Sequence, residues 1–267
     1  MITDFDTKVP AVLCEVSRLL RTVDIENAAS EARLLVAHAT GWTRTDLLAH
    51  QDREIVPKAV ALLAALVERR MAREPMSHLI GRRGFWTLEF EVGPAVLDPR
   101  PDSETLVEAA LDLFPDRQTA ISVLDLGTGS GCLLLSVLVE RADAWGVGID
   151  VSPDALAVAA RNATNAGLEG RARFVCSDWG EAIEGPFDLI LCNPPYIQSG
   201  AIEGLAPEIA QFEPHIALDG GVSGYDAYCV IGPEIVRLLS SDGAAVVEAG
   251  VGQMPEIARL FSTSGLT

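Results

Sequence analysis

Hydrophobic residues in the first third of the chain recur every three or four positions, which is the spacing of an amphipathic helix. Gly41 marks the end of one such pattern, and Pro57 suits the first turn of another helix. The pattern therefore predicts a small helical domain, which we place at residues 1–78. Its helices are expected at residues 9–23, 26–41, 44–50 and 57–72.

The period of the pattern then changes from helical spacing to alternation of apolar and polar residues. This alternation covers residues 84–101 and surrounds Gly93-Pro94, a dipeptide typical of turns. We therefore predict a β-hairpin that turns at Gly93-Pro94. The hairpin would form a connector at residues 79–100.

Beyond residue 101 short apolar runs alternate with helical patterns, the first of which Asp102 is expected to cap. Continuous apolar strands between helices indicate a parallel sheet covered on both faces, and therefore an α/β domain at residues 101–267. Strands are predicted at residues 121–127, 144–150, 172–178, 187–193 and 244–250, and helices at 103–114, 131–142, 152–167, 224–241 and 254–265.

The composition narrows the class of protein. With 267 residues, of which 49% are hydrophobic, the chain is long enough for a real core, and its formal charge is −18. This charge argues against a protein that clamps nucleic-acid phosphates, because that binding depends on Lys and Arg; the alternative is that acidity only aids solubility.

Cysteines, histidines and apolar runs exclude further classes. The five cysteines form no C-x-x-C pair and suit buried free thiols in a reducing compartment, and the four histidines show no metal-ligand spacing. The N-terminus does not resemble a signal peptide, and the longest apolar run, residues 132–139, is too short to span a membrane. We expect a soluble, cytoplasmic protein without a metal.

A glycine-rich loop, Gly127-Thr128-Gly129-Ser130-Gly131, follows the first predicted strand of the sheet and opens a helix. Such a loop lets a ligand approach the backbone and the free N–H groups of the helix N-terminus. It would suit the pyrophosphate of NAD or the carboxylate of S-adenosylmethionine, or bind nothing. Asp150 ends the next strand and is placed to accept hydrogen bonds from a ribose; its alternative role is to cap the following helix, which Ser152 could do instead.

Asp178-Trp179 closes the third predicted strand of the sheet. The carboxylate could accept a hydrogen bond from an adenine amino group, and the indole could lie against a nucleoside. The alternative for Trp179 is ordinary core packing.

Asn193-Pro194-Pro195-Tyr196 follows the fourth predicted strand and reaches the edge of the sheet where α/β folds bind ligands. Proline fixes the backbone and removes N–H donors, so this turn presents rigid acceptors. If Asn193 Oδ1 and the Pro194 carbonyl each accept one N–H of a planar amide, its nitrogen is oriented toward a methyl donor, and Tyr196 packs against the substrate plane. The alternative is a proline-stiffened loop without chemistry.

Taken together, these motifs resemble the protein-(glutamine-N5) methyltransferase family that modifies peptide chain release factors. The resemblance rests on R-P-D-S-E, D-L-G-T-G-S-G, S-D-W, N-P-P-Y-I, F-E-P-H and V-V-E-A-G, and it covers nearly the whole chain. It implies a Rossmann-like S-adenosylmethionine-dependent methyltransferase domain preceded by a helical-bundle domain that grips the factor. It also implies that the glycine loop, Asp150, Trp179 and Asn193 contact S-adenosylmethionine, which leaves as S-adenosylhomocysteine. Residues 193–196 would hold the glutamine of a Gly-Gly-Gln motif.

The chain departs from the family pattern at three places. Cys229 stands where arginine is common, Gly84 stands where an acidic residue is usual, and the sequence stops after the fifth strand of a sheet that has seven in the family. From this last departure we expect that the C-terminal strands are missing.

Other classes remain as alternatives. Glutamine methylation of a large-subunit ribosomal protein shares N-P-P-Y, although R-P-D in place of R-S-P favours the release-factor branch. An adenine-specific nucleic-acid methyltransferase would predict a basic groove. An NAD-dependent oxidoreductase would leave N-P-P-Y without a role, and a non-catalytic binding module would not need Asn193 or Tyr196.

Overall fold

The computed structural model describes residues 7–49 and 51–266 of the 267-residue chain. The chain divides into two compact units between Gly81 and Arg82. Residues 1–6, His50 and Thr267, which belong to the domains and to one helix predicted above, lie outside the described residues. The boundaries predicted at residues 78 and 100 stay predictions.

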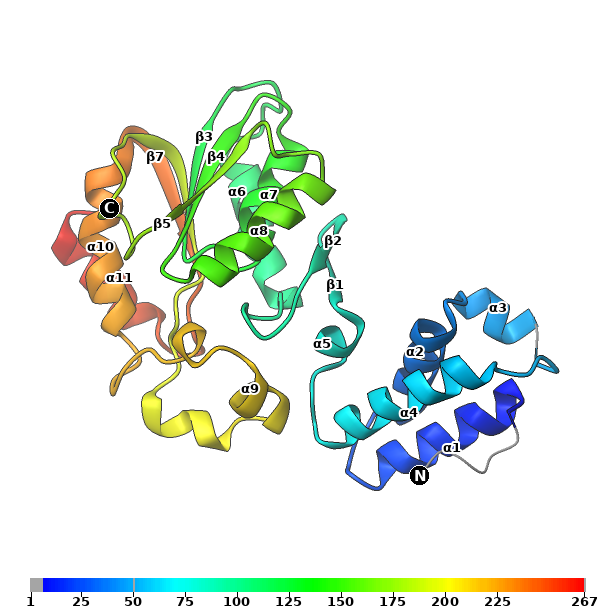
Figure 1. Cartoon of the computed structure of the whole chain (residues 1–267). Coiled ribbons are helices and arrows are strands. Elements are labelled where there is room, and N and C mark those ends of the chain that lie inside the picture. Colours follow the sequence, from blue (N-terminus) through cyan, green and yellow to red (C-terminus); the bar gives the residue numbers. More distant parts are fainter. Residues whose placement is uncertain (1–6, 50, 267) are drawn as a thin grey trace. The chain divides into compact units, whose positions relative to one another are not determined.

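The first unit is helical, as the spacing of its apolar residues predicts (Figure 1). Val16, Leu20, Leu35 and Leu63 are fully buried in its core because each recurs on the inner face of its helix. Gly41 ends the second helix in the left-handed conformation, with φ of 72°. A fifth helix is too short to give a periodic pattern and was not expected. The helices are α1 (Val9–Arg21), α2 (Ala28–Thr40), α3 (Arg44–Ala49), α4 (Pro57–Met71) and α5 (Met76–Ile80).

The predicted hairpin exists, but its turn was placed wrongly. Strands β1 (Arg82–Phe85) and β2 (Leu88–Glu91) pair antiparallel, and the chain reverses at Trp86-Thr87. Trp86 adopts a φ of 53° and donates its backbone N–H to the Glu104 carboxylate at 2.8 Å. This contact with a distant residue stabilises a turn that has no glycine or proline, so local turn signals did not reveal it. The Gly93-Pro94 signal belongs to the loop that leaves the second strand.

Five parallel strands form the sheet of the second unit, which confirms the predicted α/β class. They are β3 (Ser122–Leu126), β4 (Trp145–Asp150), β5 (Ala172–Cys176), β6 (Phe187–Cys192) and β7 (Leu239–Val247), in the order β5-β4-β3-β6-β7. Because β3 and β6 are neighbours and Leu126 pairs with Cys192, their carboxyl ends lie side by side. The loops that follow these two strands therefore meet at one edge of the sheet.

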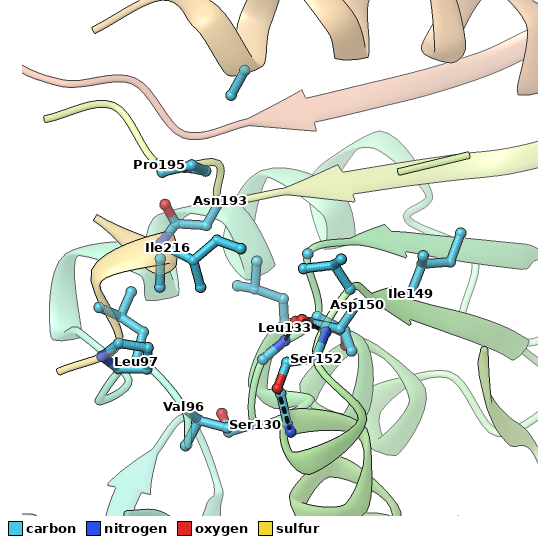
Figure 2. A pocket seen from close by; sticks show the side chains of 18 of the residues that line it. Val96, Leu97, Ser130, Leu133, Ile149, Asp150, Ser152, Asn193, Pro195 and Ile216 are labelled. Carbon is cyan, nitrogen blue, oxygen red and sulfur yellow. Dashed lines mark hydrogen bonds between the residues drawn. The ribbon is translucent and has the colours of Figure 1, made fainter. Parts of the chain in front are cut away.

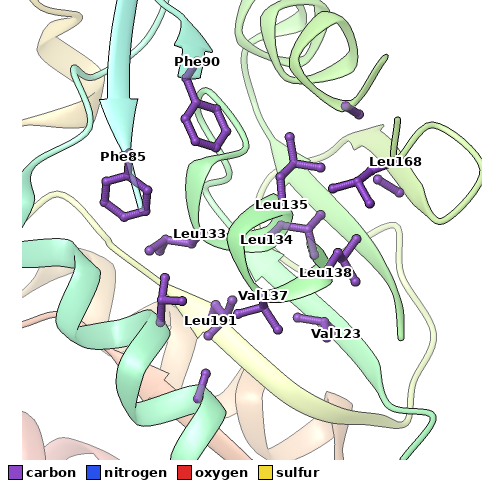
Figure 3. Close-up of a cluster of buried hydrophobic side chains, with 14 of the residues drawn as sticks. Phe85, Phe90, Val123, Leu133, Leu134, Leu135, Val137, Leu138, Leu168 and Leu191 are labelled. Carbon is purple, nitrogen blue, oxygen red and sulfur yellow. The ribbon is translucent and has the colours of Figure 1, made fainter. Parts of the chain in front are cut away.

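Helices cover both faces of this sheet. Helices α6 (Glu104–Leu113), α7 (Cys132–Glu140) and α8 (Pro153–Asn165) pack on one face, and α10 (Asp226–Leu238) and α11 (Met254–Ser264) pack on the other. Figure 3 shows Phe85 and Phe90 of the hairpin directed into the core around α7. The hairpin therefore belongs to the core of the second unit.

Short helical segments complete the second unit. Asp102 does not cap α6 as expected, because the chain forms a 3-10 turn at Pro101–Ser103 and Ser103 occupies the position before the helix. Ser152, by contrast, caps α8 by accepting the Ala155 N–H at 3.2 Å. The remaining segments are η1 (Pro101–Ser103), η2 (Ser199–Gly204), α9 (Pro207–Phe212) and η3 (His215–Ala217).

Cysteine exposure differs from the prediction. Cys192 is buried and Cys132 is half-buried, whereas Cys14, Cys176 and Cys229 are exposed at the outer positions of their elements. The expectation of five buried thiols is therefore wrong for three of them. No helix in the described part of the chain has the length and apolar character needed to cross a bilayer.

Candidate active site

A cavity of about 490 Å³ opens at the carboxyl edge of the sheet, within the second unit. Figure 2 shows its lining, with Ser130, Leu133 and Asp150 on one side and Leu97, Asn193 and Ile216 on another. Nine of the twelve predicted site residues line it: Gly127, Thr128, Gly129, Ser130, Asp150, Asp178, Trp179, Asn193 and Pro195. Gly131, Pro194 and Tyr196 are not among its lining residues.

The glycine loop connects β3 to α7 with three glycines at positive φ. Gly127, Gly129 and Gly131 have φ of 73°, 54° and 81°, which side-chain-bearing residues rarely adopt. A Cβ on Gly127 would lie 3.8 Å from the Trp179 ring, so the absent side chain keeps the space between loop and indole open. The loop thus forms one wall of the cavity out of backbone.

Asp150 fastens this loop to the end of β4. One carboxylate oxygen accepts the Gly129 N–H at 2.9 Å, and the other accepts the Ser152 N–H at 2.9 Å. Each oxygen has a second lone pair that these bonds leave available toward the cavity. The geometry therefore combines a structural role with the capacity to accept hydroxyl donors from a ligand.

Asp178 and Trp179 follow β5 on the far wall of the cavity. Asp178 is exposed, whereas Trp179 is half-buried and packs against the core on the α10 side of the sheet. Trp179 also has a φ of 45°. Its indole therefore packs in the core and also lines the cavity, whereas its contact with a nucleoside stays a prediction.

The Asn193-Pro194-Pro195-Tyr196 turn is held from several sides. Ile197 N–H bonds to the Leu218 carbonyl at 3.0 Å, and Gln253 donates to the Tyr196 carbonyl at 3.1 Å. A Cβ on Gly220 would lie 2.9 Å from the Pro195 carbonyl oxygen, so the backbone segments are in close contact. The stiffness expected from two prolines is reinforced by packing.

Asn193 also lines a second, smaller pocket of about 140 Å³. Pro194, Tyr196 and Glu248 contribute to this pocket, which is lined further by Leu97, Arg100, Ile197, Ile209, Ala217 and Leu218. Tyr196 donates its hydroxyl to Glu248 Oε1 at 3.2 Å, and burial together with the nearby Glu248 charge raises the pKa of Tyr196 to about 12. The phenol therefore stays protonated at neutral pH.

Two contact residues were not among the predicted site residues. Ser103 accepts the Asn193 amide N–H at 3.2 Å and donates its own hydroxyl to Glu248. Ser103 and Glu248 are 145 positions apart in the sequence, so no local spacing connects them. Their only signal was their presence in R-P-D-S-E and V-V-E-A-G.

One wall of the cavity is fixed by an ion pair between Arg100 and Glu213. Arg100 Nη2 donates to both carboxylate oxygens, at 2.6 and 2.8 Å. Burial raises the pKa of Glu213 to about 7, while the Arg100 charge acts against this shift. Because Pro214, Ile216 and Ala217 follow directly and line the cavity, the pair holds this wall in place.

The charges around the cavity are predominantly negative. Four carboxylates line it against a single guanidinium, which is paired with Glu213. A ligand with positive charge is favoured here, and a pyrophosphate is opposed. The carboxylates belong to Asp150, Asp178, Asp219 and Asp226, and the guanidinium to Arg100.

Neither a metal nor a reactive thiol is indicated at this site. Within residues 7–49 and 51–266, no three His, Cys, Asp or Glu side chains are grouped to hold a metal ion. Cys132 lines the cavity, and burial raises the pKa of its thiol to about 12. A thiol with such a pKa is a poor nucleophile.

Comparisons with known proteins agree with this architecture. The family model described as PrmC N-terminal domain matches residues 11–81, and the model described as Methyltransferase small domain matches residues 103–211. Among solved structures, the hMettl16 catalytic domain in complex with MAT2A 3'UTR hairpin 1 is similar, with a TM-score of 0.55 and 12% identity. The match covers 76% of this chain and 72% of that one, and it supports the fold alone. Fold and site together define a Rossmann-like methyltransferase.

Sequence relatives give the family. The Release factor glutamine methyltransferase of Rhodospirillum rubrum is 45% identical over 247 residues, 92% of this chain and 75% of that protein. The protein of the same name from Caulobacter vibrioides is 44% identical over 249 residues, 93% of this chain and 86% of that protein. The chain belongs to the release factor glutamine methyltransferase family.

Proposed function

We propose that this protein transfers a methyl group from S-adenosylmethionine to the side-chain amide nitrogen of the glutamine in the Gly-Gly-Gln motif of peptide chain release factors. The observation that carries the proposal is the position of Asn193, which lines both the large cavity and the small pocket. One side chain can thus face a methyl donor on one side and an acceptor amide on the other. Release factors act in translation, so we place the protein in the cytoplasm.

The residues around the large cavity fit S-adenosylmethionine. The glycine loop brings its backbone to the cavity wall, Asp150 offers acceptors for ribose hydroxyls, and Asp178 and Trp179 border the space for the adenine. The excess of carboxylates suits a ligand that carries a sulfonium and an ammonium group. When bound, S-adenosylmethionine supplies an electrophilic methyl group, and the electron pair of the broken C–S bond stays on sulfur in S-adenosylhomocysteine.

Asn193 and Pro194 orient the acceptor. No hydrogen bond within the described residues engages Asn193 Oδ1, and Pro194, whose carbonyl oxygen is a second acceptor, lines the small pocket. We assign these two oxygens to the two N–H groups of the substrate amide, which leaves the face of the nitrogen directed away from the turn. Orientation of this kind lowers the barrier by as much as about 7–11 kcal/mol in well-positioned reactions.

Tyr196 lines the small pocket and donates a hydrogen bond to Glu248. With a pKa of about 12, its phenol does not remove a proton at neutral pH. Its ring lines the small pocket, where Pro195 on the preceding position stiffens the turn. The residues thus place the substrate, and the proton released by the methylated nitrogen passes to water.

We assign the helical first unit to recognition of the release factor. The unit carries exposed apolar side chains, among them Leu48 and Val56, which are available for contact with a protein.

The test is a transfer assay with S-adenosylmethionine labelled in its methyl group. The purified chain is incubated with release factor, with a factor whose Gly-Gly-Gln glutamine is replaced by alanine, with large ribosomal subunits, and with an oligonucleotide that contains adenine. Label on the intact factor alone supports the proposal. Label on the oligonucleotide alone overturns it in favour of a nucleic-acid methyltransferase, and label on a ribosomal protein but on no factor overturns the choice of substrate.

A further inference from the structure

The amide of Asn193 lies at the end of a hydrogen-bonded series of three polar side chains, two of which the proposed chemistry does not yet use. Glu248 follows β7, and its backbone N–H bonds to the Cys192 carbonyl at 2.9 Å, which brings it beside Asn193. Ser103 donates its hydroxyl to Glu248 Oε2 at 2.5 Å and accepts the Asn193 amide N–H at 3.2 Å. Hydrogen bonds therefore connect the Glu248 carboxylate to the Ser103 hydroxyl, and the Ser103 hydroxyl to the Asn193 amide.

The direction of each hydrogen bond in this series follows from the number of protons that its groups carry. The hydroxyl of Ser103 carries a single proton, which it donates to Glu248 Oε2. The Ser103 oxygen can then only accept from Asn193. The group beside the Ser103 oxygen must therefore be the NH₂ of Asn193, and Asn193 Oδ1 must point away from Ser103.

Burial makes this constraint effective. Ser103 is only 2% exposed, so water cannot replace either of its hydrogen bonds. An inverted amide would set the Asn193 oxygen against a serine oxygen that has no proton left, and a mismatched buried pair is costly. The Tyr196 hydroxyl donates to the other oxygen of Glu248 and so fixes the orientation of the carboxylate.

We infer that Ser103 and Glu248 are positioning residues that hold the Asn193 amide with its oxygen presented to the substrate. This inference rests on the proposed function, because it explains how the acceptor oxygen of Asn193 is selected over its NH₂ group. Neither residue needs to touch the methyl donor or the substrate nitrogen for this role.

The experiment compares Ser103→Ala, Ser103→Thr, Glu248→Gln and the Ser103→Ala/Glu248→Gln double variant with the wild-type chain. Ser136→Ala is the matched control, because it also removes a fully buried hydroxyl, on α7, whose oxygen has no hydrogen-bond partner within the described residues. The measurements are kcat and KM for release factor, the Kd for S-adenosylmethionine by calorimetry, and the unfolding midpoint.

We expect Ser103→Ala and Glu248→Gln each to lower kcat by about tenfold to a hundredfold, as loss of a buried hydrogen bond does. The Kd for S-adenosylmethionine and the unfolding midpoint should change little, and Ser103→Thr, which keeps the hydroxyl, should restore most of kcat. Since both residues act through one amide, the double variant should be no slower than the slower single variant.

A second readout does not depend on turnover. The side-chain NH₂ resonances of Asn193, assigned by their loss in Asn193→Asp, should shift in Ser103→Ala and stay in place in Ser136→Ala. Unshifted resonances in Ser103→Ala, or multiplied losses of kcat in the double variant, would overturn the inference. If the wild-type chain does not methylate release factor, the proposed function fails, whereas the resonance test of the Ser103 contact stands by itself.

Discussion

The backbone N–H of Gly129 donates to the Asp150 carboxylate across 2.9 Å, and this bond joins the loop after β3 to the end of β4. The second oxygen of Asp150 accepts from Ser152 at the same distance. Both oxygens therefore face N–H donors before any ligand binds. This arrangement requires two acceptors at residue 150, which only a carboxylate provides.

Asp150→Asn should for this reason be no milder than Asp150→Ala. The new NH₂ group must face either the Gly129 or the Ser152 N–H, so one of the two hydrogen bonds of residue 150 is lost. We expect both variants to raise the Kd for S-adenosylmethionine by about tenfold to a hundredfold, measured by calorimetry. Asp154→Asn, on the exposed first turn of α8, is the control, and a wild-type Kd in Asp150→Asn would contradict the argument.

Asn193→Ala should lower kcat on the order of a hundredfold or more, because it removes a preorganised acceptor from the substrate amide. The affinity for S-adenosylmethionine should fall much less, since the glycine loop and Asp150 remain. Steady-state kinetics and calorimetry on the same preparations check both expectations. Asn165→Ala, at an exposed position near the end of α8, controls for the loss of an amide, and full turnover in Asn193→Ala would rule out the proposed role.

Gly131→Ala should destabilise the fold more than Gly167→Ala. Both glycines have positive φ, but a Cβ on Gly131 would lie 3.2 Å from Leu135 Cδ1 and 3.3 Å from Ala159 Cβ, whereas Gly167 has open space. The left-handed conformation alone costs about 1–2 kcal/mol, and crowding adds to it only at Gly131. Urea unfolding of the two variants measures the difference, and equal losses would mean that α7 and α8 move apart without cost.

The free energy of unfolding should depend on pH because of the buried carboxyl group of Asp125. Burial raises the pKa of this carboxyl from 3.8 to about 7, with the Thr128 hydroxyl bond acting against the shift. The folded state therefore binds the proton more tightly than the unfolded state does. The resulting stability is fully present below pH 3.8 and is lost as the pH rises through about 7.

In the window between these values, the free energy of unfolding of the wild-type chain should fall relative to Asp125→Asn by about 1.4 kcal/mol per pH unit. Chemical unfolding at several pH values gives the comparison. Asp143→Asn, which removes an exposed carboxylate, is the matched control. Parallel pH profiles for wild type and Asp125→Asn would show that Asp125 is ionised throughout.

The sequence predicted regular elements well because their signals are local. The spacing of apolar residues located α1, α2 and α4, and continuous apolar runs located β3 to β6 and the second half of β7. The first half of β7 is mostly polar, and the prediction of a helix at residues 239–241 was wrong. The prediction also failed at Trp86-Thr87, where a contact with Glu104 stabilises the turn, and at Asp102, where a 3-10 turn precedes the helix. Segments without periodicity, such as α5 and η2 to η3, were not expected either.

The candidate site shows the same division. Gly127, Asp150 and Asn193 were found from the sequence because each stands at the end of a predicted strand, and parallel strands bring such positions to one edge. Ser103 and Glu248 were not found from the sequence. They are 145 positions apart, and their contact depends on the packing of α6 against β7. Residues that act through another side chain leave no spacing to detect.

The adjacency of β3 and β6 has a consequence for protein engineering. The glycine loop and the asparagine turn keep their separation through the ladder between these two strands, and the covalent path through β4, α8 and β5 does not set it. A reporter peptide inserted at the exposed residues 169 and 170, at the end of the sheet remote from the cavity, would lengthen that path and leave the donor and acceptor halves of the site in register.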